Sequence, residues 1–238
     1  MTPQVTGRGA RKHLALALDV DNLSVALDLA EKVGRHFAVA KIGLELFIAE
    51  GPASVRAFQA LGYEVFLDLK LHDIPTTVRK AARTVGRLGV RYVTVHAQGG
   101  GSMLEAAADG LRSGALDAGF EPPMGLGITV LTSDPTPDEA TLWTRATLVR
   151  LCGLGGLVCA APDLATVRAA APGLVTVVPG TRPSGAPTDD QERIATAADA
   201  VRAGADLLVI GRAVTAAEDP EKAAASIEQE VIEALSPQ

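Results

Sequence analysis

The feature that most constrains the fold is a repeated alternation of short apolar runs with longer amphipathic stretches along the 238 residues. Nearly continuous apolar runs are typical of strands that are buried on both faces of a parallel sheet. Eight strand–helix units in a chain of this length predict a single-domain α/β protein, a (β/α)₈ TIM barrel. The runs lie at 14–19, 37–42, 64–70, 92–97, 124–131, 156–161, 174–180 and 206–211.

The stretches between these runs place apolar residues at helical spacing, and a further amphipathic stretch at 219–235 closes the chain. We therefore expect residues 1–13 to form an N-terminal tail and residues 14–238 to form the barrel. An open doubly wound sheet is the alternative architecture. It would need a glycine-rich turn after the first strand to bind a nucleotide, and residues 18–22 read LDVDN instead.

Composition and charge exclude several classes of function. The formal net charge is −6 and only 3% of residues are aromatic, which argues against nucleic-acid binding. No apolar run approaches the roughly 18 residues that a membrane helix needs, and the first residues do not resemble a secretory signal. Cys152 and Cys159 lack metal-ligand spacing. We expect them to be buried free thiols in a cytoplasmic protein.

In a (β/α)₈ barrel the active site lies at the carboxyl ends of the strands, so the polar residues near those ends are candidates for function. The charged residues among them come from the first three and the last two units of the barrel. They are Asp19, Lys41, Asp68, Lys70, His96, Thr132, Ser133, Arg182, Gly211 and Arg212.

The segment DLKLHDIP at 68–75 is the most informative part of the sequence. In an extended strand Asp68 and Lys70 project to the same side. An isolated pair of this kind is usually a solvated surface pair worth less than about 1 kcal/mol. Here we expect Asp19 and Lys41 to point at the same barrel mouth, and buried charges persist only when they are paired or when function demands them. A lysine beside carboxylates stays protonated and can deliver a proton to a carbanion.

The last two units predict a phosphate site. Residues 177–185 and 209–214 place glycine and arginine where strands seven and eight meet their loops, the usual phosphate-binding corner of this fold. Arg212 can contact phosphate oxygens with two nitrogens. The sequence therefore predicts a phosphorylated substrate.

These motifs together resemble the orotidine 5′-phosphate decarboxylase family, in the family's order and over residues 14 to about 220. The resemblance is specific, because the DxKxxD pattern alone is shared by other sugar-phosphate barrels. The motifs are LDVDN at 18–22, KIGLELF at 41–47, DLKLHDIP at 68–75, VLTS at 130–133, PGTRPSG at 179–185, DDQERI at 189–194 and VIGRA at 209–213.

The resemblance implies conversion of orotidine 5′-phosphate to uridine 5′-phosphate and CO₂, the last step of de novo pyrimidine nucleotide synthesis, without metal or cofactor. Lys70 would protonate the C6 carbanion that remains after CO₂ leaves. Asp68 would lie beside the substrate carboxylate and orient Lys70. Asp19 and Lys41 would bind the ribose hydroxyls, and Lys41 would also brace Asp68.

The resemblance also implies a homodimer whose sites lie at the interface. Asp73 and Thr77 would reach into the partner's site, and Ile74 between them is a further candidate for substrate contact. The pyrimidine would be held by Thr132, or by its neighbour Ser133, with the threonine favoured by its position in the motif.

At the phosphate end, the resemblance assigns Arg182, Gln191, Gly211 and Arg212 to the substrate. The loop at 179–190 would act as a lid. Closing it over the phosphate would let part of the phosphate's binding energy appear as catalysis.

The sequence departs from the family where asparagine usually follows DIP, because this chain has Thr76. Either residue can cap the helix that follows, so we expect Thr76 to serve as that cap.

Two other functions remain open. One is a metal-dependent sugar-phosphate decarboxylase or aldolase, which tends to carry a carboxylate where Lys41 stands. An amine there repels a cation, which argues against a metal. The other is a non-catalytic barrel that binds a phosphorylated ligand.

Overall fold

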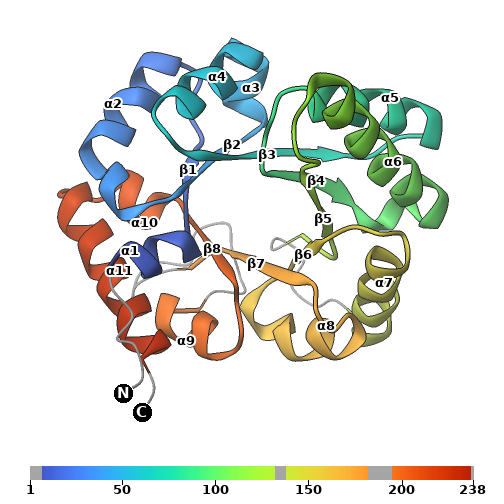
Figure 1. Ribbon diagram of the computed structural model, residues 1–238. Coiled ribbons are helices and arrows are strands. Elements are labelled where there is room, and N and C mark those ends of the chain that lie inside the picture. Colours follow the sequence, from blue (N-terminus) through green and yellow to red (C-terminus); the bar gives the residue numbers. More distant parts are fainter. Residues whose placement is uncertain (1–6, 132–137, 182–194, 237–238) are drawn as a thin grey trace.

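The computed structural model describes residues 7–131, 138–181 and 195–236, and it confirms the predicted (β/α)₈ barrel. Eight parallel strands close in chain order, and β8 pairs with β1. Figure 1 shows the strands at the centre of a ring of helices. The strands are β1 (Leu14–Leu18), β2 (Val39–Ile42), β3 (Glu64–Leu71), β4 (Tyr92–His96), β5 (Met124–Ile128), β6 (Gly156–Val158), β7 (Val175–Pro179) and β8 (Leu207–Ile210).

Helices connect the strands and cover the outside of the barrel (Figure 1). In the described chain the α-helices are α1 (Gly7–Ala10), α2 (Leu23–Val33), α3 (Leu44–Glu50), α4 (Pro52–Ala60), α5 (Pro75–Gly86), α6 (Gly101–Ala118), α7 (Glu139–Leu151), α8 (Leu164–Ala170), α9 (Ala197–Arg202), α10 (Arg212–Thr215) and α11 (Pro220–Leu235). Short 3₁₀ turns are η1 (Arg11–His13), η2 (Gly34–His36), η3 (Ala97–Gly99) and η4 (Ala161–Asp163).

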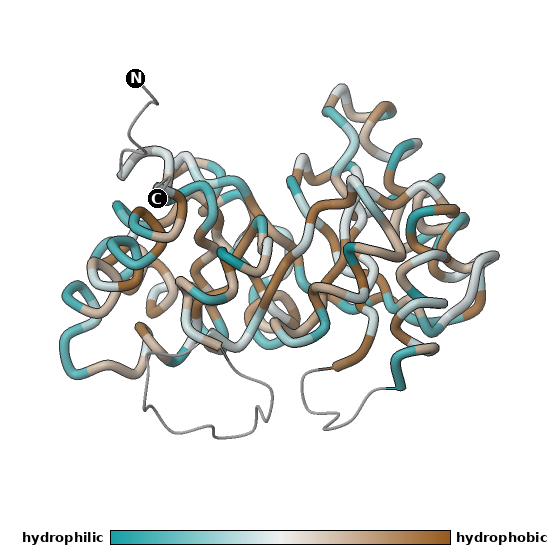
Figure 2. Tube along the Cα trace, turned by 90° about the horizontal axis from the view of Figure 1, so that it is seen from below, coloured by the Kyte–Doolittle hydropathy of each residue, from teal (hydrophilic) through white to brown (hydrophobic). Residues whose placement is uncertain are grey.

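Burial on both faces explains why the strands read as continuous apolar runs. In β1 the leucines belong to the core between barrel and helices, whereas Ala15 and Ala17 belong to the smaller core inside the barrel. Phe66 from β3 and Leu126 from β5 fill that inner core. In Figure 2 the helices carry both hydrophilic and hydrophobic residues, as amphipathic helices on such a core must.

Polar side chains cap some of the helices, but the expected cap of α5 was wrong. Asn22, from the LDVDN motif, accepts hydrogen bonds from two backbone N–H groups in the first turn of α2. Helix α5 begins at Pro75, and the residue before it, Ile74, offers no side-chain cap. Proline at the first helical position has a fixed φ that starts the helix. Thr76 consequently lies inside the first turn rather than at the cap.

The folded structure begins before the first strand. Residues 7–13 form α1 and η1, Ala10 is completely buried, and α1 lies beside α11 in Figure 1. All strands except β3 are shorter than their apolar runs, and the difference is largest for β5, which ends at Ile128, and β6, which ends at Val158. Within the described ranges, no helix has the length and apolar character needed to cross a bilayer. Cys152 and Cys159 are both buried and are not joined by a disulfide, as expected.

Candidate active site

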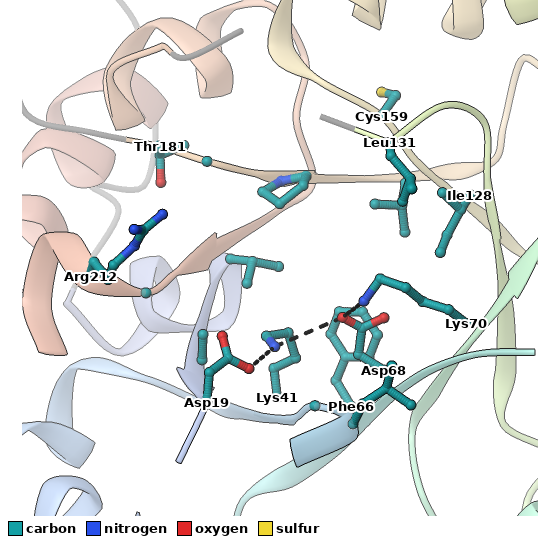
Figure 3. A pocket seen from close by; sticks show the side chains of 18 of the residues that line it. Asp19, Lys41, Phe66, Asp68, Lys70, Ile128, Leu131, Cys159, Thr181 and Arg212 are labelled. Carbon is teal, nitrogen blue, oxygen red and sulfur yellow. Dashed lines mark hydrogen bonds and ion pairs between the residues drawn. The ribbon is translucent and has the colours of Figure 1, made fainter. Parts of the chain in front are cut away.

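A pocket of about 490 Å³ opens at the carboxyl ends of the strands. This size suits a small-molecule ligand. Figure 3 shows charged side chains on one wall and apolar side chains on another. The described lining is Ala17, Asp19, Lys41, Gly43, Leu44, Phe66, Asp68, Lys70, Ile128, Val130, Leu131, Val158, Cys159, Pro179, Gly180, Thr181, Val209, Gly211, Arg212 and Thr215.

Four charged groups from three neighbouring strands form a continuous chain of ion pairs. The Lys41 Nζ atom lies 2.7 Å from Asp19 Oδ1 and 3.8 Å from Asp68 Oδ2. The Lys70 Nζ atom lies 2.6 Å from the same Asp68 oxygen. The predicted alternation of acids and amines is therefore present, and Asp68 stands between two ammonium groups (Figure 3).

Asp68 is kept ionised by its neighbours. Its side chain is only 13% exposed, and burial alone would raise the pKa of the carboxyl group. The charges of Lys41 and Lys70 and hydrogen bonds from Lys70 and Thr94 outweigh burial, so the pKa of Asp68 lies below its ordinary value of 3.8. At neutral pH the pocket therefore presents a carboxylate directly beside the Lys70 ammonium.

This lowered pKa predicts a difference in stability against pH. A carboxyl group whose pKa is depressed on folding stabilises the protein above its unfolded pKa, and that contribution is lost as pH falls through the folded pKa. Between pH 5 and pH 2.5, wild type should therefore lose more free energy of unfolding than Asp68→Asn, which cannot titrate at this position. Urea denaturation across this range measures the difference, and parallel pH curves for the two proteins would contradict it.

The backbone at Lys70 departs from a regular strand. Lys70 has a φ of 51°, the left-handed region that non-glycine residues seldom occupy. The β3–β4 register also shifts, because Leu67 pairs with Val93 whereas Leu71 pairs with Val95. Strain of about 1–2 kcal/mol at such a residue is typical of functional sites. The predicted proximity of Asp68 and Lys70 is thus correct, but a bulge rather than simple strand alternation produces it.

Gly43 leaves room for the outer end of the charged chain. A Cβ atom at this position would come 2.6 Å from Asp19 Oδ1 and 3.3 Å from Lys41 Nζ. Any larger residue would therefore push the Asp19 carboxylate away from Lys41. Gly43 directly follows Lys41 and Ile42 of the second strand, and a glycine at this place was the sequence signal that a small residue is needed here.

The opposite end of the pocket is lined by Thr181, Gly211 and Arg212, which follow β7 and β8 (Figure 3). Thr181 is 3% exposed, and among the described residues its hydroxyl has no hydrogen-bond partner. Buried polar atoms in proteins are nearly always satisfied. A polar ligand group in the pocket can supply the missing partner.

The structure brings together some of the predicted residues and not others. Asp19, Lys41, Asp68, Lys70, Gly211 and Arg212 all line the one pocket. His96 is outside that lining. So are Asp73, Ile74 and Thr77, which are exposed at the start of α5. Thr132, Ser133, Arg182, Gln191 and most of the expected lid at 179–190 lie outside the described residues.

Several residues of the site were missed in the sequence. Besides Gly43 and Thr181, these include the apolar Ile128 and Leu131, which line the same pocket as Lys70 (Figure 3). Thr94, buried behind Asp68, was also missed. A polar residue at an inward position of an apolar strand was the available signal for Thr94.

Fold and site together define a class of protein: a (β/α)₈ barrel whose mouth combines a lysine–carboxylate chain with a glycine–arginine corner after β8. The family model described as "Orotidine 5′-phosphate decarboxylase / HUMPS family" matches residues 12–227. The chain belongs to this family.

Individual proteins agree with this assignment. An orotidine 5′-phosphate decarboxylase of Anaeromyxobacter sp. (strain K) is 45% identical over 227 residues, covering 91% of this chain and 96% of that protein. One from Moorella thermoacetica is 41% identical, covering 93% of each chain. The crystal structure of orotidine 5′-phosphate decarboxylase from Lactobacillus acidophilus superposes with a TM-score of 0.79 at 31% identity, covering 92% of this chain and 99% of that one.

Proposed function

We propose that this protein decarboxylates orotidine 5′-phosphate to uridine 5′-phosphate, the last step of de novo pyrimidine nucleotide synthesis, in the cytoplasm. The observation that carries the proposal is the Lys70 ammonium, 2.6 Å from the Asp68 carboxylate inside a ligand-sized pocket. The names of the similar proteins support the same reaction.

The chemistry requires one bond to break and one proton to move. The bond between C6 and the carboxylate carbon breaks, CO₂ leaves, and the electron pair stays on C6. Lys70 then donates its proton to C6, giving uridine 5′-phosphate, and recovers a proton from water. Asp68 holds the ammonium in place before the reaction, so that little reorganisation is needed when charge develops.

The apolar wall favours the same step. Ile128 is 2% exposed and Val130 is 7% exposed, and both line the pocket with Leu131. Apolar side chains near Lys70 accept neutral CO₂ readily, and they keep water from competing as a proton donor.

Lys41 distinguishes this reaction from a metal-dependent one. Its Nζ atom is 2.7 Å from Asp19 and 3.8 Å from Asp68, so an ammonium already neutralises the two carboxylates that a cation would need. A divalent ion between them would face direct repulsion from this amine. We therefore propose catalysis without metal or cofactor, with Asp19 and Lys41 binding the ribose hydroxyls.

The working unit is a homodimer in this proposal. Asp73 and Thr77 are exposed and lie outside their own chain's pocket, where they are available to a partner. Ile74, between them, is a large apolar residue that is 66% exposed. Contact with a second subunit would bury Ile74 and bring Asp73 to the partner's Lys70.

The phosphate end makes a separate prediction. Arg212 lines the pocket with the buried hydroxyl of Thr181, and we assign both to the phosphate, together with Gly211, Arg182 and Gln191. Arg212→Ala should weaken binding of uridine 5′-phosphate by about 10- to 100-fold, the usual worth of a charge-assisted hydrogen bond.

Calorimetry with two ligands checks this assignment. Binding of uridine, which lacks the phosphate, should be the same in Arg212→Ala and wild type. Arg202→Ala removes an exposed arginine of α9 and should change neither affinity. Equal loss of affinity for the nucleotide and for the nucleoside would show that Arg212 does not recognise phosphate.

Substrate comparison tests the function itself. Purified protein with excess chelator should convert orotidine 5′-phosphate to uridine 5′-phosphate and should leave ketose and aldose phosphates unchanged. Turnover of a sugar phosphate that stops on chelation would favour the metal-dependent alternative. Binding of uridine 5′-phosphate without any turnover of orotidine 5′-phosphate would favour a non-catalytic binding barrel.

A further inference from the structure

The β3 bulge at the centre of the site leaves one backbone group in need of a partner. Between the pairs Leu67–Val93 and Leu71–Val95, three residues of β3 face the single residue Thr94 of β4. The regular ladder is interrupted there, so the Lys70 N–H cannot find a strand carbonyl in register. An unpaired N–H inside the barrel would be costly.

Thr94 supplies that partner and also reaches the catalytic carboxylate. Its Oγ1 atom accepts a hydrogen bond from the Lys70 backbone N–H at 2.9 Å. The same hydroxyl donates to Asp68 Oδ1 at 2.8 Å. One hydroxyl has one proton to donate and lone pairs to accept with, so both bonds form together. Thr94 is 1% exposed, so water does not compete for either bond.

The two carboxylate oxygens of Asp68 therefore have different hydrogen-bond partners. Oδ1 is held by Thr94, and Oδ2 receives the Lys70 ammonium at 2.6 Å. Holding Oδ1 fixes the rotation of the carboxylate and turns Oδ2 toward the pocket. The hydroxyl also ties the left-handed backbone of Lys70, so it constrains this lysine at both ends.

We propose that Thr94 is a positioning residue for the Asp68–Lys70 pair: its hydroxyl replaces the missing ladder partner of Lys70 and orients the carboxylate that holds the Lys70 ammonium. Thr94 does not touch the substrate in this account. The proposal rests on the decarboxylase function proposed above.

Two substitutions separate the hydroxyl from the shape of the side chain. Thr94→Val keeps the shape and removes both hydrogen bonds, whereas Thr94→Ser keeps the hydroxyl. We expect the single-turnover rate of decarboxylation to fall by about 10- to 100-fold in Thr94→Val, as for other hydrogen bonds to charged groups, with KM changed less than about threefold. Thr94→Ser should stay within about threefold of wild type in both quantities.

A matched control exists in the same barrel. Thr176 of β7 is also 1% exposed, and its Oγ1 atom lies 2.9 Å from the Gly204 carbonyl oxygen and 2.8 Å from Asp206 Oδ2, outside the pocket lining. Its one proton is donated to one of these two acceptors. Thr176→Val should lower the melting temperature while the decarboxylation rate stays unchanged. This control separates loss of a buried hydrogen bond in general from loss of the one at the site.

The pH profile gives a readout that a purely structural role would not move. The Thr94 hydrogen bond is one of the interactions that lower the pKa of Asp68. In Thr94→Val the acid limb of kcat/KM should therefore shift to higher pH, and in Thr94→Ser it should not. Full activity of Thr94→Val with an unmoved acid limb would overturn the proposal. Equal damage in the valine and serine variants would overturn it too.

Failure of the proposed function would be recognised separately. If wild type does not turn over orotidine 5′-phosphate, that function falls, and the role of Thr94 is then decided by ¹³C NMR titration of labelled aspartate. Asp68, assigned with Asp68→Asn, should titrate at higher pH in Thr94→Val than in wild type. The same titration in both proteins would end the proposal.

Discussion

Lys70→Ala should lower the rate of uridine 5′-phosphate formation by more than about 10⁴-fold, the upper range for loss of a positioned acid. The side chain removed is the only ammonium within 3 Å of Asp68 among the described residues. Without it, the C6 carbanion loses both its proton donor and the stabilising positive charge of that ammonium. Stopped-flow ultraviolet absorbance measures the rate.

A lysine remote from the site provides the control for this loss. Lys32 is exposed on α2, and Lys32→Ala should retain the wild-type rate. Uridine 5′-phosphate should still bind to Lys70→Ala, since the phosphate end is untouched. A Lys70→Ala protein within tenfold of the wild-type rate would remove Lys70 from the chemical step.

Two inactive variants should restore activity when they share a dimer. Asp73→Asn should reduce turnover by at least about 100-fold, because the partner's site loses a carboxylate beside its lysine. In a hybrid of Lys70→Ala and Asp73→Asn subunits, one of the two sites has both residues intact. Random assembly of co-expressed subunits should therefore recover about a quarter of wild-type activity, as two-fold symmetry requires.

The controls for this experiment are the two homodimers in which both subunits carry the same substitution. Each of these homodimers should remain inactive. If Asp73 acted in its own chain, the hybrid would also remain inactive, and the shared-site arrangement would be wrong. Size-exclusion chromatography with light scattering confirms that the hybrids are dimers.

The barrel could be predicted from sequence because its strands must be buried on both faces. Leu14, Leu16 and Leu18 meet the helices while Ala15 and Ala17 fill the interior, so neither face could be polar. The same logic overextended β5, whose run continues apolar past Ile128 although the strand ends there. An apolar run therefore predicts that its residues are buried, but it does not predict where strand pairing ends.

The charged chain was predictable for a similar reason, while its detailed geometry was not. Asp19, Lys41 and Asp68 come from adjacent strands of a barrel that closes in chain order, so their convergence follows from topology. The bulge at Lys70 depends on a register shift against β4, which no local pattern encodes. Thr94 was missed for that reason, because its role exists only once the shift is known.

Local rules also gave a wrong result at Thr76. The capping preference of threonine is real, but Pro75 starts α5 two residues earlier than a cap at Thr76 would. By contrast, the roles proposed for Asp73 and Thr77 involve a second subunit, and they stay predictions.

The most direct test of the central claim is to identify the product that the protein forms from orotidine 5′-phosphate in heavy water with excess chelator. We predict one CO₂ released for each uridine 5′-phosphate and one deuterium at C6, visible by mass spectrometry and by loss of the C6 proton signal in NMR. Recovery of unchanged orotidine 5′-phosphate from protein that still binds uridine 5′-phosphate would contradict the claim that this pocket decarboxylates its ligand and protonates the carbanion.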